Sequence, residues 1–456
     1  MSENKWFGTD GVRGVVGEFP MVADFATSLG KAMAKLICTK YKKVAIARDT
    51  RESGKMLEKA LSDGLISGGV DVLLLGIMPT PAVTSLVSEL NVDMAVMITA
   101  SHNPNQYNGI KLIANTGDKL ADNITARLER FIEKETVEEK NVNIGKIFED
   151  NQVLEKYLKK VKTAVVKEKA LVGMKIVVDC ANGCFSNILP KVFESLGAEV
   201  IVLACSPNGE NINSDSGTEH TENMCEKVVD VNADMGIAVD GDGDRIIICD
   251  NLGKRIDGDQ IIAFLATYYK QHKYLLSDTV VATIVSNPAL DIYLANNGIK
   301  CVRSIVGERY VIDEMKNVKA NIGGEESGHI VISDYAKTGD ALIAGLIFAQ
   351  GVWEQKQKIS NLFPLFKPII RKRIDIKFIN KNKMMKAFEN DELKQKIGKW
   401  KNIIKNDSMV LVRKSGTEPK IQVWVWNDDE DLALNAVQDI SAVLEKTEGF
   451  ESCRKF

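Results

Sequence analysis

The stretch Asp240-Gly241-Asp242-Gly243-Asp244-Arg245 places three carboxylates within five residues, with a glycine between each pair. The apolar run Ile237-Ala238-Val239 precedes it and the apolar run Ile246-Ile247-Ile248 follows it, so we expect it to join two buried strands. Like charges this close repel, and removing each from water is costly unless something compensates. A divalent cation such as Mg²⁺, which prefers oxygen ligands, is the natural compensator.

Two other interpretations of this stretch are open. An ordinary polar turn is rich in Asp and Gly, but it rarely carries three Asp without Lys or Asn among them. A calcium-binding EF-hand loop also begins with acidic residues at alternate positions, but it needs Gly at the sixth position and Glu at the twelfth. Those positions are Arg245 and Asn251 here, which excludes the EF-hand. We therefore favour a metal site.

Composition indicates a multidomain globular protein. A chain of 456 residues is too long for one core and predicts about three or four domains. The net charge of −3 gives no electrostatic reason to expect nucleic acid or a membrane as a partner, and no apolar run is long enough to span a membrane. The N-terminus lacks the apolar segment of a signal peptide, and the eight cysteines are scattered, so we expect a reduced, cytoplasmic protein.

Three segments repeat one plan, in which a strand leads to a polar residue, a helix ends at glycine, and a second strand follows. This plan is typical of mixed or parallel sheets covered by helices. It predicts an α/β fold with three similar α/β domains that contain mixed sheets. The paired strands are expected at 44–47 and 70–75, 175–178 and 198–203, and 280–285 and 299–303.

The last ninety residues lack this plan and alternate in polarity over 373–377 and 420–426, which predicts a smaller C-terminal α+β domain. A charged stretch from Thr125 to Lys169, expected to be helical, should contain the first domain junction. The predicted domains are 1–152, 153–252, 253–366 and 367–456.

Four further motifs contain residues suited to phosphate or sugar chemistry. Taken singly, each is as well explained by a polar turn. Taken together with a metal site, they describe a hydroxyl nucleophile, a loop that binds sugar hydroxyls and a phosphate-binding loop. The motifs are FGTDGVRG (Phe7–Gly14), TASHNPNQYNGIK (Thr99–Lys111), GGEESGH (Gly323–His329) and RKSGTEP (Arg413–Pro419).

A Ser-His-Asp hydrolase is a competing hypothesis for the second motif. However, Ser101 is directly followed by His102, and adjacent side chains on an extended backbone point to opposite sides. The Gly-x-Ser-x-Gly motif of many hydrolases is also absent here.

The five motifs, in this chain order, resemble those of the α-D-phosphohexomutase superfamily. MPTPAV (Met78–Val83), PNGENIN (Pro207–Asn213) and VGERYV (Val306–Val311) make the chain most similar to the bacterial-type phosphoglucosamine mutase branch. The resemblance covers essentially the whole chain. It implies four domains around a central cleft, and a phosphoserine that exchanges its phosphoryl group with a hexose phosphate through a bisphosphorylated sugar.

The resemblance also implies roles for individual residues. The metal ligands for Mg²⁺ would be Ser101, through its phosphate, with Asp240, Asp242 and Asp244. The residues at the transferring phosphate would be Ser101, Lys111, Arg245, Arg13 and His102. The substrate-binding residues would be Glu308 in a loop, Glu325 and Ser327 at the sugar hydroxyls, and Arg413, Ser415, Gly416 and Thr417 at the distal phosphate.

The implied function is interconversion of glucosamine 6-phosphate and glucosamine 1-phosphate, with Mg²⁺ as cofactor and a bisphosphorylated hexose as activator. A phosphoglucomutase or phosphomannomutase of the same fold is the near alternative. A metal-dependent phosphosugar phosphatase and a phosphosugar-binding sensor are alternatives of other classes. The partner is a small phosphosugar, and we expect a monomer or homodimer.

Several details of the sequence carry expectations of their own. Gly243 stands where the family more often has Ala or Pro, which should only loosen the loop. Glu326 stands where phosphoglucosamine mutases mostly have Gln or Asn, and Gln422 replaces a family arginine that can aid the phosphate site. Nearby Mg²⁺ and arginines would lower the pKa of Lys111, and a lowered pKa would suit it to act as a general acid or base.

Overall fold

The computed structural model describes residues 5–8, 10–37, 41–134, 143–164, 170–406, 409–415 and 418–456. The chain forms two compact units, which are described separately below. The first contains Met1–Ala282 and Ser304–Leu365, and the second contains Thr283–Arg303 and Phe366–Phe456. Among the described residues, no helix combines the length and apolar character that crossing a membrane would require.

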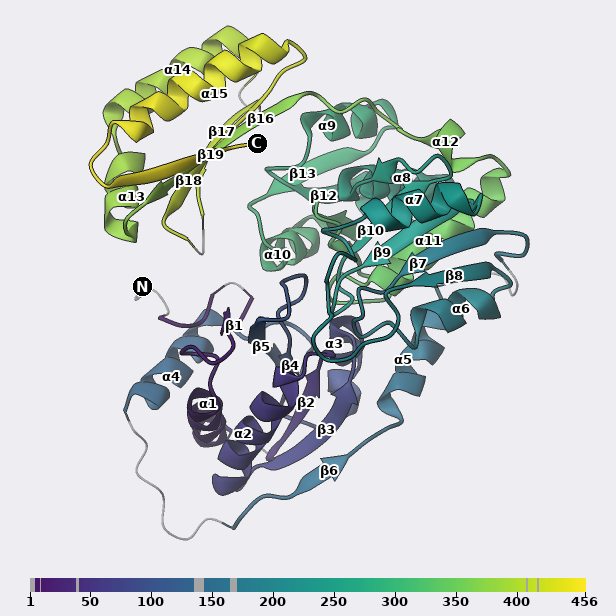
Figure 1. The fold of residues 1–456 in the computed structure, drawn as a ribbon, viewed down its shortest axis with the longest axis vertical. Helices are drawn as coiled ribbons and strands as arrows, with labels where there is room; N and C mark the ends of the chain where they lie inside the picture. The colour runs from purple at the N-terminus through teal and green to yellow at the C-terminus, as the bar shows by residue number, and fades with distance from the viewer. Residues whose placement is uncertain are drawn as a thin grey trace. The chain divides into compact units, whose positions relative to one another are not determined.

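The first unit begins with a six-stranded mixed sheet (Figure 1). β2 pairs in parallel with β3 and β4, whereas β5 pairs antiparallel with β1 and β4. The runs Val44–Ala47 and Met94–Ile98 are wholly buried, which explains why both read as continuous apolar strands. In spatial order the strands are β1 (Val12–Val15), β5 (Tyr107–Ala114), β4 (Met94–Ile98), β2 (Lys43–Arg48), β3 (Asp71–Ile77) and β6 (Ile147–Glu149).

Helices α1 and α2 pack against each other beside this sheet because glycine allows their backbones to approach closely (Figure 1). A Cβ on Gly64 would lie 2.2 Å from Thr27 O, and a Cβ on Gly30 would lie 2.4 Å from Leu61 O. The helical elements of this part are α1 (Ala23–Leu36), α2 (Ser53–Ser67), α3 (Thr80–Leu86), η1 (Val87–Glu89), α4 (Asp122–Glu133) and α5 (Val153–Lys162).

A second, five-stranded sheet carries the acidic stretch. β9 and β10 form an antiparallel hairpin in which Val239 pairs with Ile246, so residues 240–245 are its turn. β7 pairs in parallel with β8 and β9. The elements are β11 (Arg255–Ile256), β10 (Ile246–Asp250), β9 (Met235–Val239), β7 (Lys175–Asp179) and β8 (Glu199–Leu203), with α6 (Leu189–Ser195) and α7 (Glu222–Asp230).

The remainder of the first unit is built around β12 (Thr279–Thr283, whose last residue belongs to the second unit), which pairs in parallel with β14, and around the β14–β15 hairpin. Asp257 and Asp340 cap the N-termini of α8 and α11 by accepting hydrogen bonds from Gln260 N and Ile343 N. The other elements are β14 (Ile322–Gly324), β15 (Ile330–Ile332), α8 (Gly258–Gln271), η2 (Leu276–Asp278), α10 (Glu308–Val318), α11 (Ala341–Gln355) and α12 (Ile359–Leu362).

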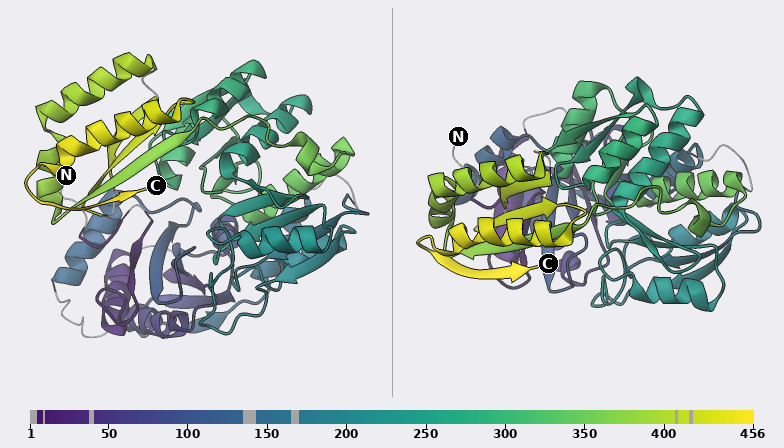
Figure 2. Two further views of the ribbon diagram at one scale, coloured as in Figure 1. Left: turned by 45° about the horizontal axis from the view of Figure 1, so that its top comes forward. Right: turned by 90° about the horizontal axis from the view of Figure 1, so that it is seen from above.

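The second unit contains a four-stranded antiparallel sheet whose helices α14 and α15 run side by side (Figure 2). Ile421, Val423 and Val425 of β18 point into a core shared with α15. In spatial order the strands are β17 (Val410–Lys414), β18 (Lys420–Trp426), β16 (Arg371–Phe378) and β19 (Phe450–Lys455). The other elements of the unit are α9 (Pro288–Asn296), β13 (Lys300–Ser304, whose last residue belongs to the first unit), α13 (Lys381–Phe388), α14 (Asp391–Ile404) and α15 (Glu430–Glu445).

The predicted fold class is confirmed: the chain is an α/β protein with three α/β domains containing mixed sheets and a smaller C-terminal domain. Two local predictions were wrong. The stretch Thr125–Lys169 is not helical throughout, because β6 extends the first sheet in parallel with β3. The strand expected over 280–285 ends at Thr283.

We expect Gly64→Ala to lower the free energy of unfolding by about 1–3 kcal/mol, because the new methyl group would overlap the Thr27 carbonyl of the neighbouring helix. The measurement is the unfolding midpoint of the variant against wild type, followed by circular dichroism.

Gly398→Ala in α14 is the matched control. A Cβ there has nothing within 4 Å, so the substitution should raise helix stability by roughly 0.5–1 kcal/mol. Equal effects of the two substitutions would contradict the close packing of α1 on α2.

Candidate active site

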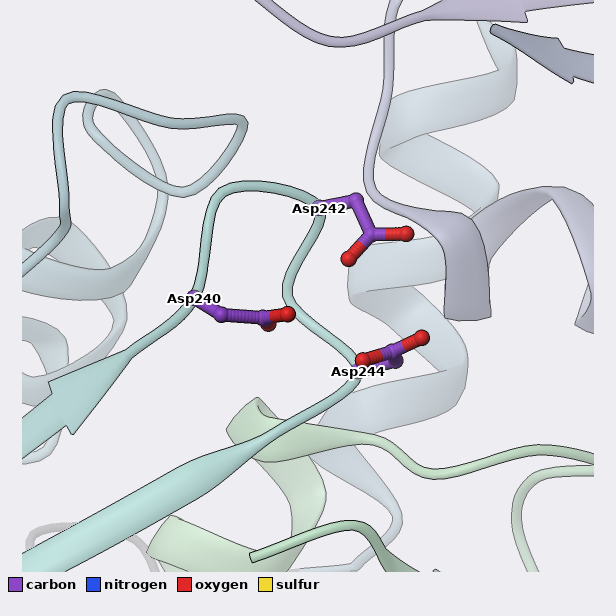
Figure 3. Close-up of side chains that lie close together, drawn as sticks. All are labelled: Asp240, Asp242 and Asp244. Carbon is purple, nitrogen blue, oxygen red and sulfur yellow. The ribbon is translucent and has the colours of Figure 1, made fainter. Parts of the chain in front are cut away.

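The β9–β10 turn brings three buried carboxylates together (Figure 3). One ligand oxygen from each of Asp240, Asp242 and Asp244 lies within 4.8 Å of the others. The backbone N–H groups of Gly243 and Arg245 donate to Asp240 Oδ1, each at 3.1 Å, and so hold that side chain inside the turn. The predicted convergence of the three acidic residues is therefore present in the structure.

Glycine is required at two positions of this turn. Gly243 has φ +77°, and a Cβ there would lie 2.2 Å from Cε2 of the Phe185 ring. A Cβ on Gly241 would lie 2.9 Å from Ser101 O. Gly243 therefore does more than loosen the loop, because a side chain there would be strained by the positive φ and would displace the Phe185 ring.

Three side chains of the first domain reach the acidic turn. Ser101 Oγ donates to Asp240 Oδ2 at 2.6 Å, and Thr80 Oγ1 donates to Asp242 Oδ2 at 2.6 Å. Lys111 Nζ bridges Asp242 Oδ2 at 2.8 Å and Asp244 Oδ2 at 3.1 Å. Ser101 and Lys111 were predicted at this place. Thr80 was missed, although it follows the end of β3 inside the MPTPAV motif.

The donor set fits a hard divalent cation. Among the described residues, Asp242 Oδ1 and Asp244 Oδ1 are buried without a hydrogen-bond partner. Burial, followed by the charges of Asp244 and Asp242, raises the pKa of Asp240 well above its usual value. A cation with oxygen ligands would satisfy both oxygens and remove the repulsion that raises this pKa.

Ser101 and His102 face the same way, contrary to prediction. Ser101 has φ +53°, a left-handed conformation rather than an extended one, and its Oγ lies 3.4 Å from His102 Nδ1. Burial, together with Arg245 and Arg13, lowers the pKa of His102 to about 2. Among the described residues, no carboxylate forms a hydrogen bond or ion pair with His102, whereas a Ser-His-Asp hydrolase needs a carboxylate bonded to its histidine.

The pKa of Lys111 is raised, not lowered. Burial alone would lower it, but the carboxylates of Asp10, Asp242 and Asp244 outweigh burial and hold it well above the usual value. Asp10 Oδ2 lies 3.6 Å from Lys111 Nζ. The expectation of a lowered pKa rested on bound Mg²⁺ and the arginines, whereas these carboxylates outweigh Arg13.

The two predicted arginines flank the turn. Arg13 Nη2 donates to Asp10 Oδ2 at 2.6 Å, and Arg13 Nη1 donates to Asn103 Oδ1 at 3.4 Å. Arg245 Nη1 lies 3.8 Å from Glu219 Oε1. Among the described residues, the Nε atoms of both arginines are buried without a hydrogen-bond partner, although Arg245 Nε lies 4.0 Å from Asp244 Oδ1 in an ion pair.

The loop between β14 and β15 lies beside the acidic turn. Ile246 N donates to Gly328 O at 2.9 Å, and His329 forms an isolated backbone bridge with Arg245. Glu325 Oε1 accepts a hydrogen bond from Gly307 N at 3.0 Å, while Ser327 Oγ lies 3.4 Å from Glu325 Oε2. The two residues predicted to bind sugar hydroxyls are thus brought to the same region as the acidic turn.

Glu308 was expected in a loop, but it is the first residue of α10. Its Oε2 lies 2.6 Å from Lys119 Nζ, and its Oε1 lies 3.3 Å from His329 Nε2 and accepts a short hydrogen bond from Thr338 Oγ1. Burial would raise the pKa of Glu308, but the positive charges of Lys119 and His329 outweigh burial and lower the pKa below its usual value. The carboxylate is therefore charged.

Glu326 adds a charge beside the N-terminus of α8. Its carbonyl oxygen accepts a hydrogen bond from Gly258 N at 3.0 Å. The pKa of Asp257 is raised, first by burial and also by the negative charge of Glu326. The departure from the family at this position therefore bears on the start of α8.

The predicted phosphate loop lies in the second unit, between β17 and β18. Ser415 N donates to Lys420 O at 2.8 Å, and Glu418 N lies 3.3 Å from Ser415 Oγ. Arg413 is cross-strand partner of Gln422. The predicted residues Gly416 and Thr417 lie outside the described residues.

Gln422, which stands where the family has an arginine, is engaged within the second unit. Its Nε2 donates to Asp375 Oδ2 at 3.2 Å. Arg373 pairs with the same carboxylate through two hydrogen bonds of 2.7 Å, so an arginine is present one strand away from Gln422.

Fold and site together place the chain among enzymes that transfer phosphoryl groups on sugar phosphates. The family described as phosphoglucomutase/phosphomannomutase matches three parts of the chain: its alpha/beta/alpha domain I at residues 4–139, domain II at 155–253 and domain III at 257–369. The chain belongs to this family.

Within the family, the chain is similar to phosphoglucosamine mutases. It is 41% identical over 446 residues to the phosphoglucosamine mutase of Paracoccus denitrificans, covering 97% of this chain and 99% of that protein. It is 40% identical over 447 residues to the phosphoglucosamine mutase of Parvibaculum lavamentivorans, with 97% and 98% coverage. The predicted resemblance is thus confirmed over essentially the whole chain.

Solved structures share the fold. A phosphoglucomutase/phosphomannomutase family protein from Burkholderia thailandensis has a TM-score of 0.79 at 21% identity, covering 98% of this chain and 100% of that one. N-acetylphosphoglucosamine mutase from Aspergillus fumigatus, in complex with GlcNAc-6P and magnesium, has a TM-score of 0.66 at 15% identity, with 96% and 95% coverage.

We expect Asp242→Asn to weaken Mg²⁺ binding by about 10-fold or more, because it removes one charge and one hard oxygen from the buried set. Isothermal titration calorimetry of the purified protein with Mg²⁺ provides the measurement.

Asp250→Asn is the control, since Asp250 lies at the other end of β10 and accepts hydrogen bonds from Leu252 N and Lys254 N. Unchanged Mg²⁺ affinity in Asp242→Asn, or an equal loss in Asp250→Asn, would show that the cation binds elsewhere.

Proposed function

We propose that the protein interconverts glucosamine 6-phosphate and glucosamine 1-phosphate, with Mg²⁺ as cofactor and a phosphoserine at Ser101. The observation that carries the proposal is the 2.6 Å hydrogen bond from Ser101 Oγ to Asp240, one of three buried carboxylates. The full-length identity of about 40% to phosphoglucosamine mutases supports glucosamine as the sugar.

The reaction requires two transfers of a phosphoryl group. In the first, a free hydroxyl of the bound hexose phosphate attacks the phosphorus on Ser101; the new sugar O–P bond forms as the serine O–P bond breaks, and the hydroxyl loses a proton while Ser101 Oγ gains one. The product is a bisphosphorylated hexose. After this intermediate reorients in the site, Ser101 Oγ attacks the other phosphate. The serine O–P bond forms as that sugar O–P bond breaks, and the serine loses a proton while the sugar oxygen gains one, which restores the phosphoserine and leaves the isomer.

The chain's own residues orient and stabilise these steps. Lys111 lies between Asp242 and Asp244 close to the serine, and we assign Lys111 Nζ to donate a proton to Ser101 Oγ as its bond to phosphorus breaks. The guanidinium groups of Arg13 and Arg245 stabilise negative charge on the transferring group, and His102 lies beside Ser101. Bound Mg²⁺, held by Asp240, Asp242 and Asp244, would supply neutralisation of phosphate charge.

Substrate recognition is assigned to two loops. Glu325 and Ser327 offer an acceptor and a hydroxyl to the sugar, with charged Glu308 nearby. Arg413, Ser415, Gly416 and Thr417 are proposed to bind the distal phosphate through charge and N–H groups. A bisphosphorylated hexose would activate the enzyme by phosphorylating Ser101.

Other predictions from the sequence extend this proposal. The domains are proposed to span 1–152, 153–252, 253–366 and 367–456. The protein is proposed to be cytoplasmic, a monomer or homodimer, and to have a small phosphosugar as its partner.

A metal-dependent phosphosugar phosphatase would use the same residues with water as acceptor. Added hexose bisphosphate separates the two activities, because it should stimulate a mutase by restoring the phosphoserine and should act only as a substrate for a phosphatase. Buried Ser101 and Lys111 favour the mutase, since exclusion of water disfavours hydrolysis.

Ser101→Ala should lower kcat by roughly 10⁴-fold or more, because the residue that accepts and returns the phosphoryl group is lost. The assay is isomerisation of glucosamine 1-phosphate in the presence of a bisphosphorylated hexose, with unfolding followed in parallel.

Ser62→Ala is the control: Ser62 is also a buried serine of the first domain, but its hydroxyl donates to Glu58 O within α2. Wild-type kcat in Ser101→Ala would exclude the phosphoserine mechanism.

Comparison of kcat/KM for glucosamine, glucose and mannose 1-phosphates tests the proposed substrate. We expect a preference for glucosamine 1-phosphate of about 10-fold or more, which one additional polar contact provides. A preference for glucose or mannose would instead support the phosphoglucomutase or phosphomannomutase alternative.

A further inference from the structure

Arg51 is a buried arginine that the proposed function does not use. It lies between β2 and α2, and its side chain is 0% exposed. A guanidinium removed from water is stable only if its charge is paired and its donors are satisfied. The charge is paired with Asp49, whose Oδ2 accepts from Arg51 Nε at 2.9 Å and whose Oδ1 accepts from Arg51 N at 2.9 Å.

The other four N–H groups of Arg51 all point to one loop, Ser101–Tyr107. The loop's carbonyl oxygens surround the guanidinium, so all five donors of the side chain have acceptors. Nη2 donates to Ser101 O at 3.1 Å and Asn103 O at 2.7 Å, and Nη1 donates to Pro104 O at 2.6 Å and Tyr107 O at 3.0 Å.

This arrangement supports an unfavourable backbone conformation at the serine. The left-handed conformation of Ser101, with φ +53°, is unfavourable for a residue with a Cβ. Arg51 and Asn213 both hold the carbonyl of Ser101; Asn213 Nδ2 donates to Ser101 O at 2.8 Å and to Asn103 O at 3.0 Å. The resulting turn directs Ser101 Oγ to Asp240 Oδ2.

We propose that Arg51 is a positioning residue for phosphoryl transfer: its guanidinium folds the Ser101–Tyr107 loop so that the serine oxygen faces the acidic turn. Arg51 acts through the loop backbone, and among the described residues it forms no hydrogen bond or ion pair with the three aspartates of the acidic turn. The kinetic part of this inference rests on the proposed function, whereas the conformational part does not.

The segment that carries Arg51 also links the first two domains. Thr50 Oγ1 donates to Asn182 O at 2.7 Å, and Glu52 N donates to Gly209 O at 3.0 Å. The loop after β7 in turn supports the acidic turn, because Cys184 N donates to Gly241 O at 2.9 Å. Arg51 therefore lies between the Ser101–Tyr107 loop and the second-domain loops that contact the acidic turn.

The test is Arg51→Lys, which keeps the positive charge but has three donors in place of five and no planar fork. We expect kcat to fall about 100-fold, as a misplacement of about 1 Å at the reacting atom can cause. KM should stay within about threefold of wild type, because the sugar contacts are unchanged. A crystal structure of the variant should show Ser101 no longer left-handed.

Arg48→Lys is the matched control. Arg48 lies three residues earlier, and its Nε is 3.5 Å from Glu58 Oε2. Among the described residues, no hydrogen bond or ion pair joins its side chain to the Ser101–Tyr107 loop. It should retain wild-type kcat. Asn213→Ala removes two hydrogen bonds to the same carbonyls without breaking an ion pair, and it serves if Arg51→Lys does not fold; kcat should fall about 10-fold with little change in KM.

Wild-type kcat in both Arg51→Lys and Asn213→Ala, or an unchanged Ser101 conformation in the crystal structure of the variant, would overturn the inference. If the wild-type protein does not isomerise glucosamine phosphates, the proposed function fails. The positioning role is then decided by the Ser101 conformation in crystals of Arg51→Lys or, if that variant does not fold, of Asn213→Ala.

Discussion

Three carboxylates buried on one tight turn are unstable without positive charge and hydrogen-bond donors, and the turn itself supplies too few. Gly243 N and Arg245 N satisfy one oxygen of Asp240. The remaining donors come from another domain: Ser101, Thr80 and Lys111. Because an unpaired buried charge is costly, the acidic turn and the serine loop stabilise each other, and a divalent cation would complete the charge balance.

The same local turn recurs after a strand in the first and second domains, and it positions these groups. In the first domain Asp49 follows β2 and accepts a hydrogen bond from the N–H two residues later, at Arg51. In the second, Asp179 at the end of β7 accepts from Ala181 N in the same way, and also from Gly217 N. Each aspartate turns the chain sharply at the carboxyl end of a strand, where α/β sheets bring their functional loops.

The sequence motifs predicted which residues meet at the site, but they did not predict the conformations of those residues. Spacing placed Asp240, Asp242 and Asp244 on one turn, and the buried run before Ser101 placed the serine at a strand end. The direction of Ser101 Oγ depends on the positive φ of Ser101. Hydrogen bonds from Arg51, which is fifty residues away in the sequence, to four carbonyl oxygens of the loop stabilise that conformation. Neighbouring residue types do not encode such contacts.

The residues that were missed and the details that were predicted wrongly also depend on contacts between residues far apart in the sequence. Arg51 and Thr80 look like ordinary polar residues in sequence, because their roles arise only when the chain folds. The pKa of Lys111 depends on Asp10, about one hundred residues away, and the need for glycine at position 243 depends on the Phe185 ring. The helix–glycine–strand pattern, by contrast, is local, so the three α/β domains were predictable.

The most direct test of the central claim follows the phosphoryl group itself. Protein carrying ³²P on Ser101 is mixed with unlabelled glucosamine 6-phosphate and quenched on the millisecond timescale. We expect the label to leave the serine at least as fast as kcat, and to appear first in a bisphosphorylated sugar and then in the monophosphate. Label that remains on Ser101 through many turnovers, or that is released as inorganic phosphate, would exclude transfer through the phosphoserine.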